Sequence, residues 1–364
     1  MSLAVGIIGL PNVGKSTIFN ALSNGKAAAE NYPFCTIDPN HGIVAVPDER
    51  LNRITAMIPT KKIIPAFMEL VDIAGLVKGA SKGDGLGNQF LGHIKDVNAV
   101  VHVVRCFEND DIVHVEGSID PSRDISIIDT ELMLTDLGTV ERNISRTEKA
   151  AKSGDKESLA KLAVFKKVQE SLSKGIPIRK SFTDPEELKM IAELHLLTSK
   201  PVLYVANVDD SSISEDNDAV KMVRKIAAEE NAGCVKLCGK LESELADLSD
   251  DDKAEFLKDL GLEEPGLAIL TKEAYKLLGL ETYFTAGEPE NRAWTIKKGF
   301  KAPEAAGVIH TDFEKGFIKA DVYTLEDLET YKSEVALRAA GKIRSEGREY
   351  VVQDGDIMFF KFNV

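Results

Sequence analysis

The feature that most constrains the fold is a glycine-rich stretch directly after the first apolar run. Residues 3–8 form a short apolar run typical of a buried strand, and Gly9-Leu-Pro-Asn-Val-Gly-Lys-Ser16 follows it at once. A helical pattern begins at Ser16 and continues to Leu22. This spacing matches the loop in which backbone N–H groups and the start of a helix face a phosphate. The sequence therefore predicts a strand, a phosphate-binding loop and a helix in succession.

Later apolar runs predict the α/β class with a mostly parallel sheet. The runs begin at Phe67, Ala99, Pro201 and Gly233. Those at Ala99 and Pro201 are nearly continuous, as expected for strands that are buried on both faces. Because parallel strands need crossover connections, we expect helices between them.

Residues 133–199 interrupt this pattern with helical periodicity. Met133, Leu137, Val140 and Ile144 are spaced by four and three residues, which predicts an inserted helical hairpin of the coiled-coil type. From residue 140 to 200 there are 13 lysines and arginines against nine acids. Two interpretations remain open: a solvated hairpin, or a basic arm that binds RNA or another acidic surface.

Composition limits the classes of partner. The formal net charge of −14 excludes a basic field over the whole molecule, so nucleic-acid contact requires a local patch, and we expect no DNA partner. No apolar stretch approaches the ~18 residues of a membrane span, and we expect no membrane contact. Four cysteines are too few for a disulfide scaffold, which favours reduced thiols and a cytoplasmic location.

The glycine-rich loop predicts how a nucleoside triphosphate is held. Lys15 is expected to reach the β- and γ-phosphates, and its charge favours the reaction there. The predicted nucleotide-binding residues of this loop are Asn12, Val13, Gly14, Lys15, Ser16 and Thr17.

A magnesium site is predicted beside the loop. Ser16 is expected to bind Mg²⁺ directly, and Asp72, at the end of the strand that begins at Phe67, through water. Gly75, in Asp72-Ile-Ala-Gly75, is expected to direct its N–H at the γ-phosphate, a catalytic role. Thr36 is either a further Mg²⁺ ligand on a switch segment or a structural turn residue.

Base recognition is predicted where the late strand that begins at Pro201 ends. Asn207-Val208-Asp209-Asp210 occupies the place of the Asn-Lys-x-Asp motif of GTPases, with Val208 instead of the lysine. We expect Asn207, Val208 and Asp210 to contact the nucleotide. A second wall is expected from Cys238 and Gly239, after the following strand.

Five stretches resemble the YchF-type Obg-like ATPases, a family of P-loop NTPases. They are Gly9–Ser16, Asn31–Thr36, Val71–Gly79, Gly83–Phe90 and His102–Asn109. The resemblance implies a G domain at residues 1–132 and 200–279, a helical coiled-coil insertion at 133–199, and a C-terminal α+β TGS domain, ubiquitin-like, at 281–364. It also implies slow ATP hydrolysis, an ability to bind GTP, and association with the ribosome.

One departure from ordinary GTPases in this part of the sequence bears on the mechanism, and one further residue suggests a cation. Leu76 stands where many GTPases carry the glutamine that orients the attacking water, and the resemblance points to His114 as the replacement, ahead of His93 and His41. An ordinary loop histidine is the alternative for His114. Asn12 stands where related cation-activated NTPases hold K⁺, so stimulation by K⁺ is a further hypothesis.

The sequence thus predicts a Mg²⁺-dependent nucleotide hydrolase that acts as a ribosome-associated switch. The lost lysine and the resemblance favour ATP, whereas the carboxylate of Asp210 favours GTP, so a GTP-specific GTPase stays an alternative. A second alternative is a nucleotide-gated module that binds the ribosome or RNA and whose turnover is incidental. A metabolic kinase is disfavoured because no second substrate site is evident.

Overall fold

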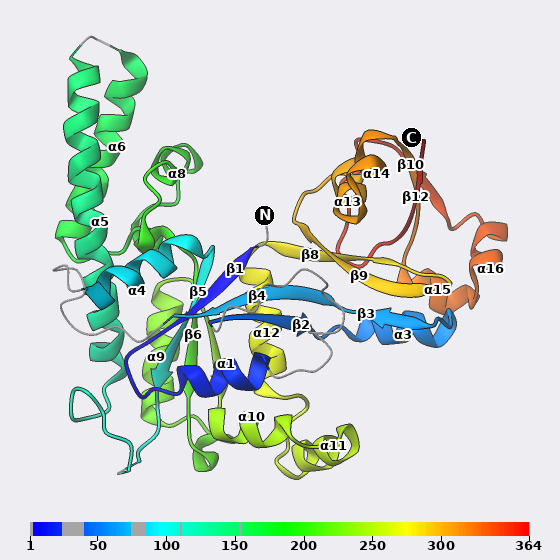
Figure 1. Ribbon diagram of the computed structural model, residues 1–364, viewed down its shortest axis with the longest axis horizontal. Helices are drawn as coiled ribbons and strands as arrows, with labels where there is room; N and C mark the ends of the chain where they lie inside the picture. The colour runs from blue at the N-terminus through cyan, green and yellow to red at the C-terminus, as the bar shows by residue number, and fades with distance from the viewer. Residues whose placement is uncertain (1–2, 24–39, 74–84, 110, 153–154, 364) are drawn as a thin grey trace. The chain divides into compact units, whose positions relative to one another are not determined.

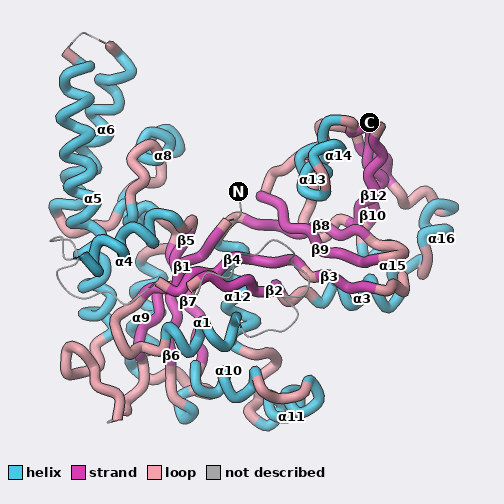
Figure 2. Tube along the Cα trace, viewed as in Figure 1, coloured by secondary structure: helices cyan, strands magenta, loops and turns pink. Residues whose placement is uncertain are grey.

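The computed structural model describes residues 3–23, 40–73, 85–109, 111–152 and 155–363. Figures 1 and 2 show them as a ribbon and as a tube. Thr36, Gly75 and Leu76 lie outside the described residues. In the part of the chain that is described, no helix is both long enough and apolar enough to cross a membrane.

The first sheet has the strand order β2-β4-β1-β5-β6-β7. Its strands are β1 (Ala4–Ile8), β2 (His41–Val46), β4 (Ala66–Asp72), β5 (Ala99–Arg105), β6 (Val202–Asn207) and β7 (Gly233–Leu237). The pairs β1–β4, β1–β5, β5–β6 and β6–β7 are parallel, and every residue of β5 and β6 is buried. The predicted α/β class with a mostly parallel sheet is therefore confirmed.

Helices connect these strands, as parallel pairing requires. They are α1 (Lys15–Ser23), α4 (Gly85–Asp96), α5 (Pro121–Ala151), α6 (Lys156–Ser173), α7 (Ile178–Ser181), α8 (Pro185–Ala192), α9 (Asp218–Glu229), α10 (Gly239–Ala246), α11 (Asp250–Asp259) and α12 (Gly266–Leu277), with 3₁₀ turns η2 (Leu197–Ser199) and η3 (Asp210–Ser212). Because the strands run in parallel, their carboxyl ends meet at one edge of the sheet, where the phosphate loop, Asp72 and Asn207 lie.

Helices α5 and α6 form an antiparallel arm with a core of its own (Figure 1). Val140 and Ile144 of α5 pack with Phe165 and Val168 of α6 in this cluster, which α7 and α8 extend. Helix α5 begins at Pro121, capped by Asp120, so it is longer than the stripe from Met133 indicates. It runs without a break from the edge of the nucleotide-binding fold into the arm.

The second sheet has the order β11-β10-β12-β8-β9-β3. Its strands are β3 (Lys62–Ile64), β8 (Leu280–Thr285), β9 (Glu290–Lys297), β10 (Phe317–Tyr323), β11 (Arg344–Glu346) and β12 (Ile357–Phe362), with helices α3 (Glu49–Met57), α13 (Ala302–Ile309), α14 (Thr311–Lys315), α15 (Leu325–Tyr331) and α16 (Glu334–Ala339). Its apolar core includes Tyr283, Ile296 and Phe360.

The chain divides into two compact units. Among the described residues, the first holds 3–23, 40–42, 69–73, 85–109, 111–152 and 155–274, and the second holds 43–68 and 275–363. Within the second unit, β3 pairs in parallel with β9. The division into a G domain, an insertion and a TGS domain at the predicted boundaries stays a prediction.

Candidate functional site

Backbone geometry explains the glycines of the loop between β1 and α1. A Cβ on Gly9 would lie 2.5 Å from the carbonyl oxygen of Val103, and one on Gly14 would lie 2.3 Å from Nδ2 of Asn207. Gly14 also has a φ of +97°, and Asn12 has a φ of 61°. Side chains are excluded at both glycines, because a loop that turns its N–H groups inward needs close approach of the backbone.

Lys15 lies inside this loop rather than in solvent. Its Nζ donates to the carbonyl oxygen of Leu10 at 2.7 Å, and the residue is only 7% exposed. Burial lowers the pKa of Lys15 to about 8, against an opposing attraction from Asp72. The lysine is thus held by one carbonyl at the centre of the loop, where an anion would gain most from its charge.

This lowered pKa predicts how nucleotide affinity depends on pH. A bound polyphosphate favours protonated Lys15, so binding above the free pKa of about 8 must take up a proton. We expect the affinity for a non-hydrolysable ATP analogue to be flat below pH 7.5 and to fall about tenfold by pH 9. Titrations between pH 7 and 9.5 measure this, with Lys15→Arg, which stays charged, as the pH-independent control. A wild-type affinity that stays constant up to pH 9.5 contradicts the assignment of Lys15 as the titrating group that binds the phosphates.

Ser16 and Asp72 form the candidate metal site. Ser16 Oγ lies 3.2 Å from Asp72 Oδ2, across the gap between α1 and β4. Asp72 Oδ1 is buried and has no hydrogen-bond partner among the described residues. A buried carboxylate oxygen without a partner is costly, and a hard cation with its water shell would satisfy it. The donors present, a hydroxyl and a carboxylate, are those that Mg²⁺ takes.

The residues predicted for the base are brought together, and Asn207 ties them to the phosphate loop. Its Nδ2 donates to the carbonyl oxygen of Val13 at 2.8 Å, and its Oδ1 accepts from the N–H of Gly239 at 2.9 Å. Asn207 is 4% exposed. A single buried amide therefore sets the distance between the phosphate loop and the start of α10.

Asp210 is already engaged by two side chains of this region. Its Oδ1 accepts from the thiol of Cys238 at 3.2 Å, and its Oδ2 pairs with Lys240 Nζ at 3.2 Å. Burial is the main cause that raises the pKa of Cys238 to about 11, so its thiol is protonated and donates. Val208, at the position of the GTPase lysine, is only 2% exposed and offers little surface to a base.

His114 lies on the loop that follows β5, and this loop reaches the phosphate loop. Asn12 Nδ2 donates to the carbonyl oxygen of Val113 at 3.1 Å. The His114 ring itself points elsewhere, with Nε2 2.9 Å from Asp124 Oδ2 in the first turn of α5. The structure thus brings the backbone of this segment to the nucleotide loop, and the imidazole to the arm.

Sequence reasoning missed Arg105, the last residue of β5. This residue is 2% exposed, and its guanidinium donates to the carbonyl oxygens of Phe107, Asn109 and Ile112 at 2.9 to 3.1 Å. It shapes the segment that carries His114. An arginine at the end of a largely apolar run is the signal that could have pointed to it, since a buried guanidinium needs several acceptors.

The positions of the other predicted residues say less about their roles. Thr17 is exposed on the first turn of α1, next to Ser16. His41 pairs with Glu69 at 2.9 Å, at the start of β2, and this contact has no evident link to the site. His93 lies in α4. The predicted roles of Thr36 and Gly75 fall outside the described residues.

A parallel sheet with a phosphate loop after its first strand, and a carboxylate at the end of a neighbouring strand, defines the class of P-loop NTPases. Residues 4–134 match a family model described as "50S ribosome-binding GTPase". Residues 280–363 match YchF-GTPase_C, described as "Protein of unknown function (DUF933)".

Full-length relatives narrow the class to one family. The chain is 52% identical over 366 residues to a Bacillus subtilis (strain 168) protein and 54% identical over 364 residues to one from Haemophilus influenzae, each covering 100% of both chains. Both relatives are named "Ribosome-binding ATPase YchF". The chain belongs to the YchF family, as the resemblance implied. The Schizosaccharomyces pombe YchF GTPase structure has the same fold, with a TM-score of 0.90 and 41% identity over 99% of this chain and 98% of that one.

Proposed function

We propose that this chain is a Mg²⁺-dependent nucleoside triphosphate hydrolase that prefers ATP and binds the ribosome. The observation that carries the hydrolase proposal is the group formed by Lys15, Ser16 and Asp72. It joins a buried cation, a hydroxyl and a carboxylate oxygen without a partner among the described residues. Each is the group that a Mg²⁺-triphosphate needs at this place.

Ser16 and Asp72 would hold the Mg²⁺, with Thr36 as the third proposed ligand. When bound, the ion neutralises charge on the β- and γ-phosphate oxygens and helps to orient them. Lys15 supplies a further positive charge, and the N–H groups of the loop, with the proposed addition of Gly75, bind the remaining phosphate oxygens. His114 is the proposed group that positions the attacking water, and Asn12 the proposed residue beside K⁺.

The contacts of Asp210 support a preference for ATP. A carboxylate that reads guanine accepts from two guanine N–H groups, one at each oxygen. Here Cys238 and Lys240 already donate to these two oxygens, so guanine would have to compete with them for the carboxylate. Adenine has no such pair of N–H groups and loses nothing by leaving the contacts intact. The relatives' names differ on this point, since two say ATPase and one says GTPase.

Titration of ATP and GTP with Mg²⁺ tests the preference. We expect wild type to bind ATP at least about tenfold more tightly than GTP, a gap of ~1.4 kcal/mol. Lys240→Met removes the donor to Asp210 Oδ2 and should narrow the difference in affinity between ATP and GTP. Lys221→Met, which removes an exposed lysine paired with Asp218 elsewhere, is the control for net charge. Tighter binding of GTP by wild type overturns the proposed preference.

The proposal of a ribosomal partner is supported by the relatives' names and by the basic excess of the arm. The structure qualifies this excess, because Lys161, Lys166, Lys167 and Lys174 each lie within 3.1 Å of a glutamate carboxylate. The positive surface is therefore weaker than the residue count indicates. A cytoplasmic location follows from the same proposal.

A further inference from the structure

The hydrogen bonds of His114 define its tautomer. The backbone N–H of Glu116 donates to Nδ1 at 3.1 Å, so Nδ1 carries no proton. Nε2 lies 2.9 Å from Asp124 Oδ2, an acceptor, and therefore carries the proton. Both ring nitrogens are used inside the protein, and the side chains of His114 and Asp124 are 6% and 4% exposed. In this arrangement no ring nitrogen is left to hold a water.

The imidazole of His114 belongs to a loop whose backbone already contacts the phosphate loop. Asn12 holds Val113, the neighbour of His114, against the phosphate loop, and Arg105 fixes the carbonyls that precede it. Gly117, with a φ of +77°, closes the turn by donating to the carbonyl oxygen of His114 at 3.0 Å. The backbone on both sides of His114 is therefore fixed beside the phosphate loop, while its ring faces α5.

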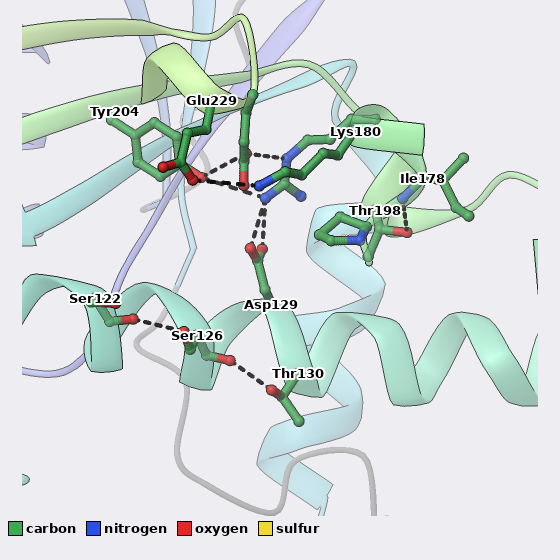
Figure 3. A network of polar contacts seen from close by, with 12 residues as sticks. Ser122, Ser126, Asp129, Thr130, Ile178, Lys180, Thr198, Tyr204 and Glu229 are labelled. Carbon is green, nitrogen blue, oxygen red and sulfur yellow. Dashed lines mark hydrogen bonds and ion pairs between the residues drawn. The ribbon is translucent and has the colours of Figure 1, made fainter. Parts of the chain in front are cut away.

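Asp124 belongs to the helix that forms the arm. It lies in the first turn of α5, where Arg123 also donates to its Oδ1 at 3.0 Å. Just over one turn further along α5, Asp129 is clamped by Arg179 with two contacts of 2.8 Å (Figure 3). Beyond that point α5 continues into the arm. Helix α5 thus joins the arm directly to the turn that holds His114.

We propose that Asp124 is a positioning residue that withholds His114 from the nucleotide. The Nε2–H···Asp124 bond keeps the imidazole turned to α5, and displacement of the first turn of α5 releases it toward the P-loop. The inference rests on the proposed function and deepens it. It makes the arm, the part proposed to meet the ribosome, the element that controls hydrolysis.

Turnover of Asp124 variants tests this. We expect Asp124→Ala to raise phosphate release from MgATP, without any partner present, about tenfold over wild type. Asp124→Asn, which can still accept from Nε2–H but lacks the charge, should give a smaller rise. Arg123→Gln removes the other partner of the same carboxylate and should leave turnover unchanged. Each rise must vanish when His114→Ala is added, because the released ring is the cause.

The outcomes separate the proposed hold of Asp124 on His114, the latch, from the hydrolase proposal. If His114→Ala lowers wild-type turnover and both folded Asp124 variants leave it unchanged or lower it, the latch is wrong and the hydrolase proposal stands. If wild type releases no phosphate with Mg²⁺, the function fails and the latch with it. Imidazole ¹⁵N shifts give a readout independent of activity. The latch predicts an Nε2–H tautomer in wild type that is lost in Asp124→Ala, and a solvent-averaged ring in wild type overturns it.

Discussion

Replacement of Lys15 by methionine is expected to weaken the binding of MgATP at least a hundredfold. The ammonium lies within the loop, 7% exposed, and holds only the carbonyl of Leu10 in the described structure. A phosphate that replaces this carbonyl gains charge-assisted hydrogen bonds worth about 1.5–3 kcal/mol each. A hundredfold loss corresponds to ~2.7 kcal/mol. Methionine keeps most of the apolar stem, so the loop loses its charge without a large cavity.

The same substitution should not destabilise the free protein. Burial lowers the pKa of Lys15, which means that the folded state disfavours the charge, and removing it relieves that cost. Isothermal titration with a non-hydrolysable analogue, with a thermal melt of each protein, measures both effects. Affinity within threefold of wild type shows that Lys15 does not bind the phosphates.

The largest expected effect on stability is at Arg179, in the base of the arm. Its guanidinium contacts Asp129 twice at 2.8 Å and Glu230 at 3.0 Å, and the side chains of Arg179 and Glu230 are 8% and 5% exposed. Tyr204 donates to the same carboxylate of Glu230 at 3.0 Å (Figure 3). The burial of these groups raises the pKa of Asp129 against the pull of Arg179. Asp129 therefore depends chiefly on Arg179 for its charged form.

Arg179→Met should lower the free energy of unfolding by about 3–5 kcal/mol, because it leaves two buried carboxylates without their cation. The neighbouring residue is a matched control. Lys180 lies 3.8 Å from Glu229, and its side chain is 37% exposed, so Lys180→Met should cost less than about 0.5 kcal/mol. Urea unfolding of both variants gives the comparison. Equal small losses of unfolding free energy in the two variants show that the contacts of Arg179 with Asp129 and Glu230 do not stabilise the fold.

The parallel sheet and the phosphate loop were predictable because their signals are local. Val100 and Val205 lie within nearly continuous apolar runs, and the loop glycines stand at a fixed spacing from Lys15. The pairing of β3 with β9 was not predictable, since Lys62 and Glu290 are joined only by long-range register. No local pattern marks so short an edge strand.

The site was predictable by residue type but not by contact. Asp72, Asn207 and Asp210 were identified from motifs, whereas the donors already bound to Asp210 depend on side chains that only the fold assembles. Asp124 carried no signal, because an acid in the first turn of a helix usually serves the helix dipole. Only its contact with His114 indicates a second role.

Phosphate release from ATP by the wild-type chain, with Mg²⁺ and after its removal by chelation, tests the central claim most directly. The account predicts turnover that needs Mg²⁺ and is lost in Lys15→Met, because Ser16, Asp72 and Lys15 act on one bound Mg²⁺-triphosphate. Turnover that persists without divalent metal, or wild-type protein that releases no phosphate although it binds MgATP, contradicts it.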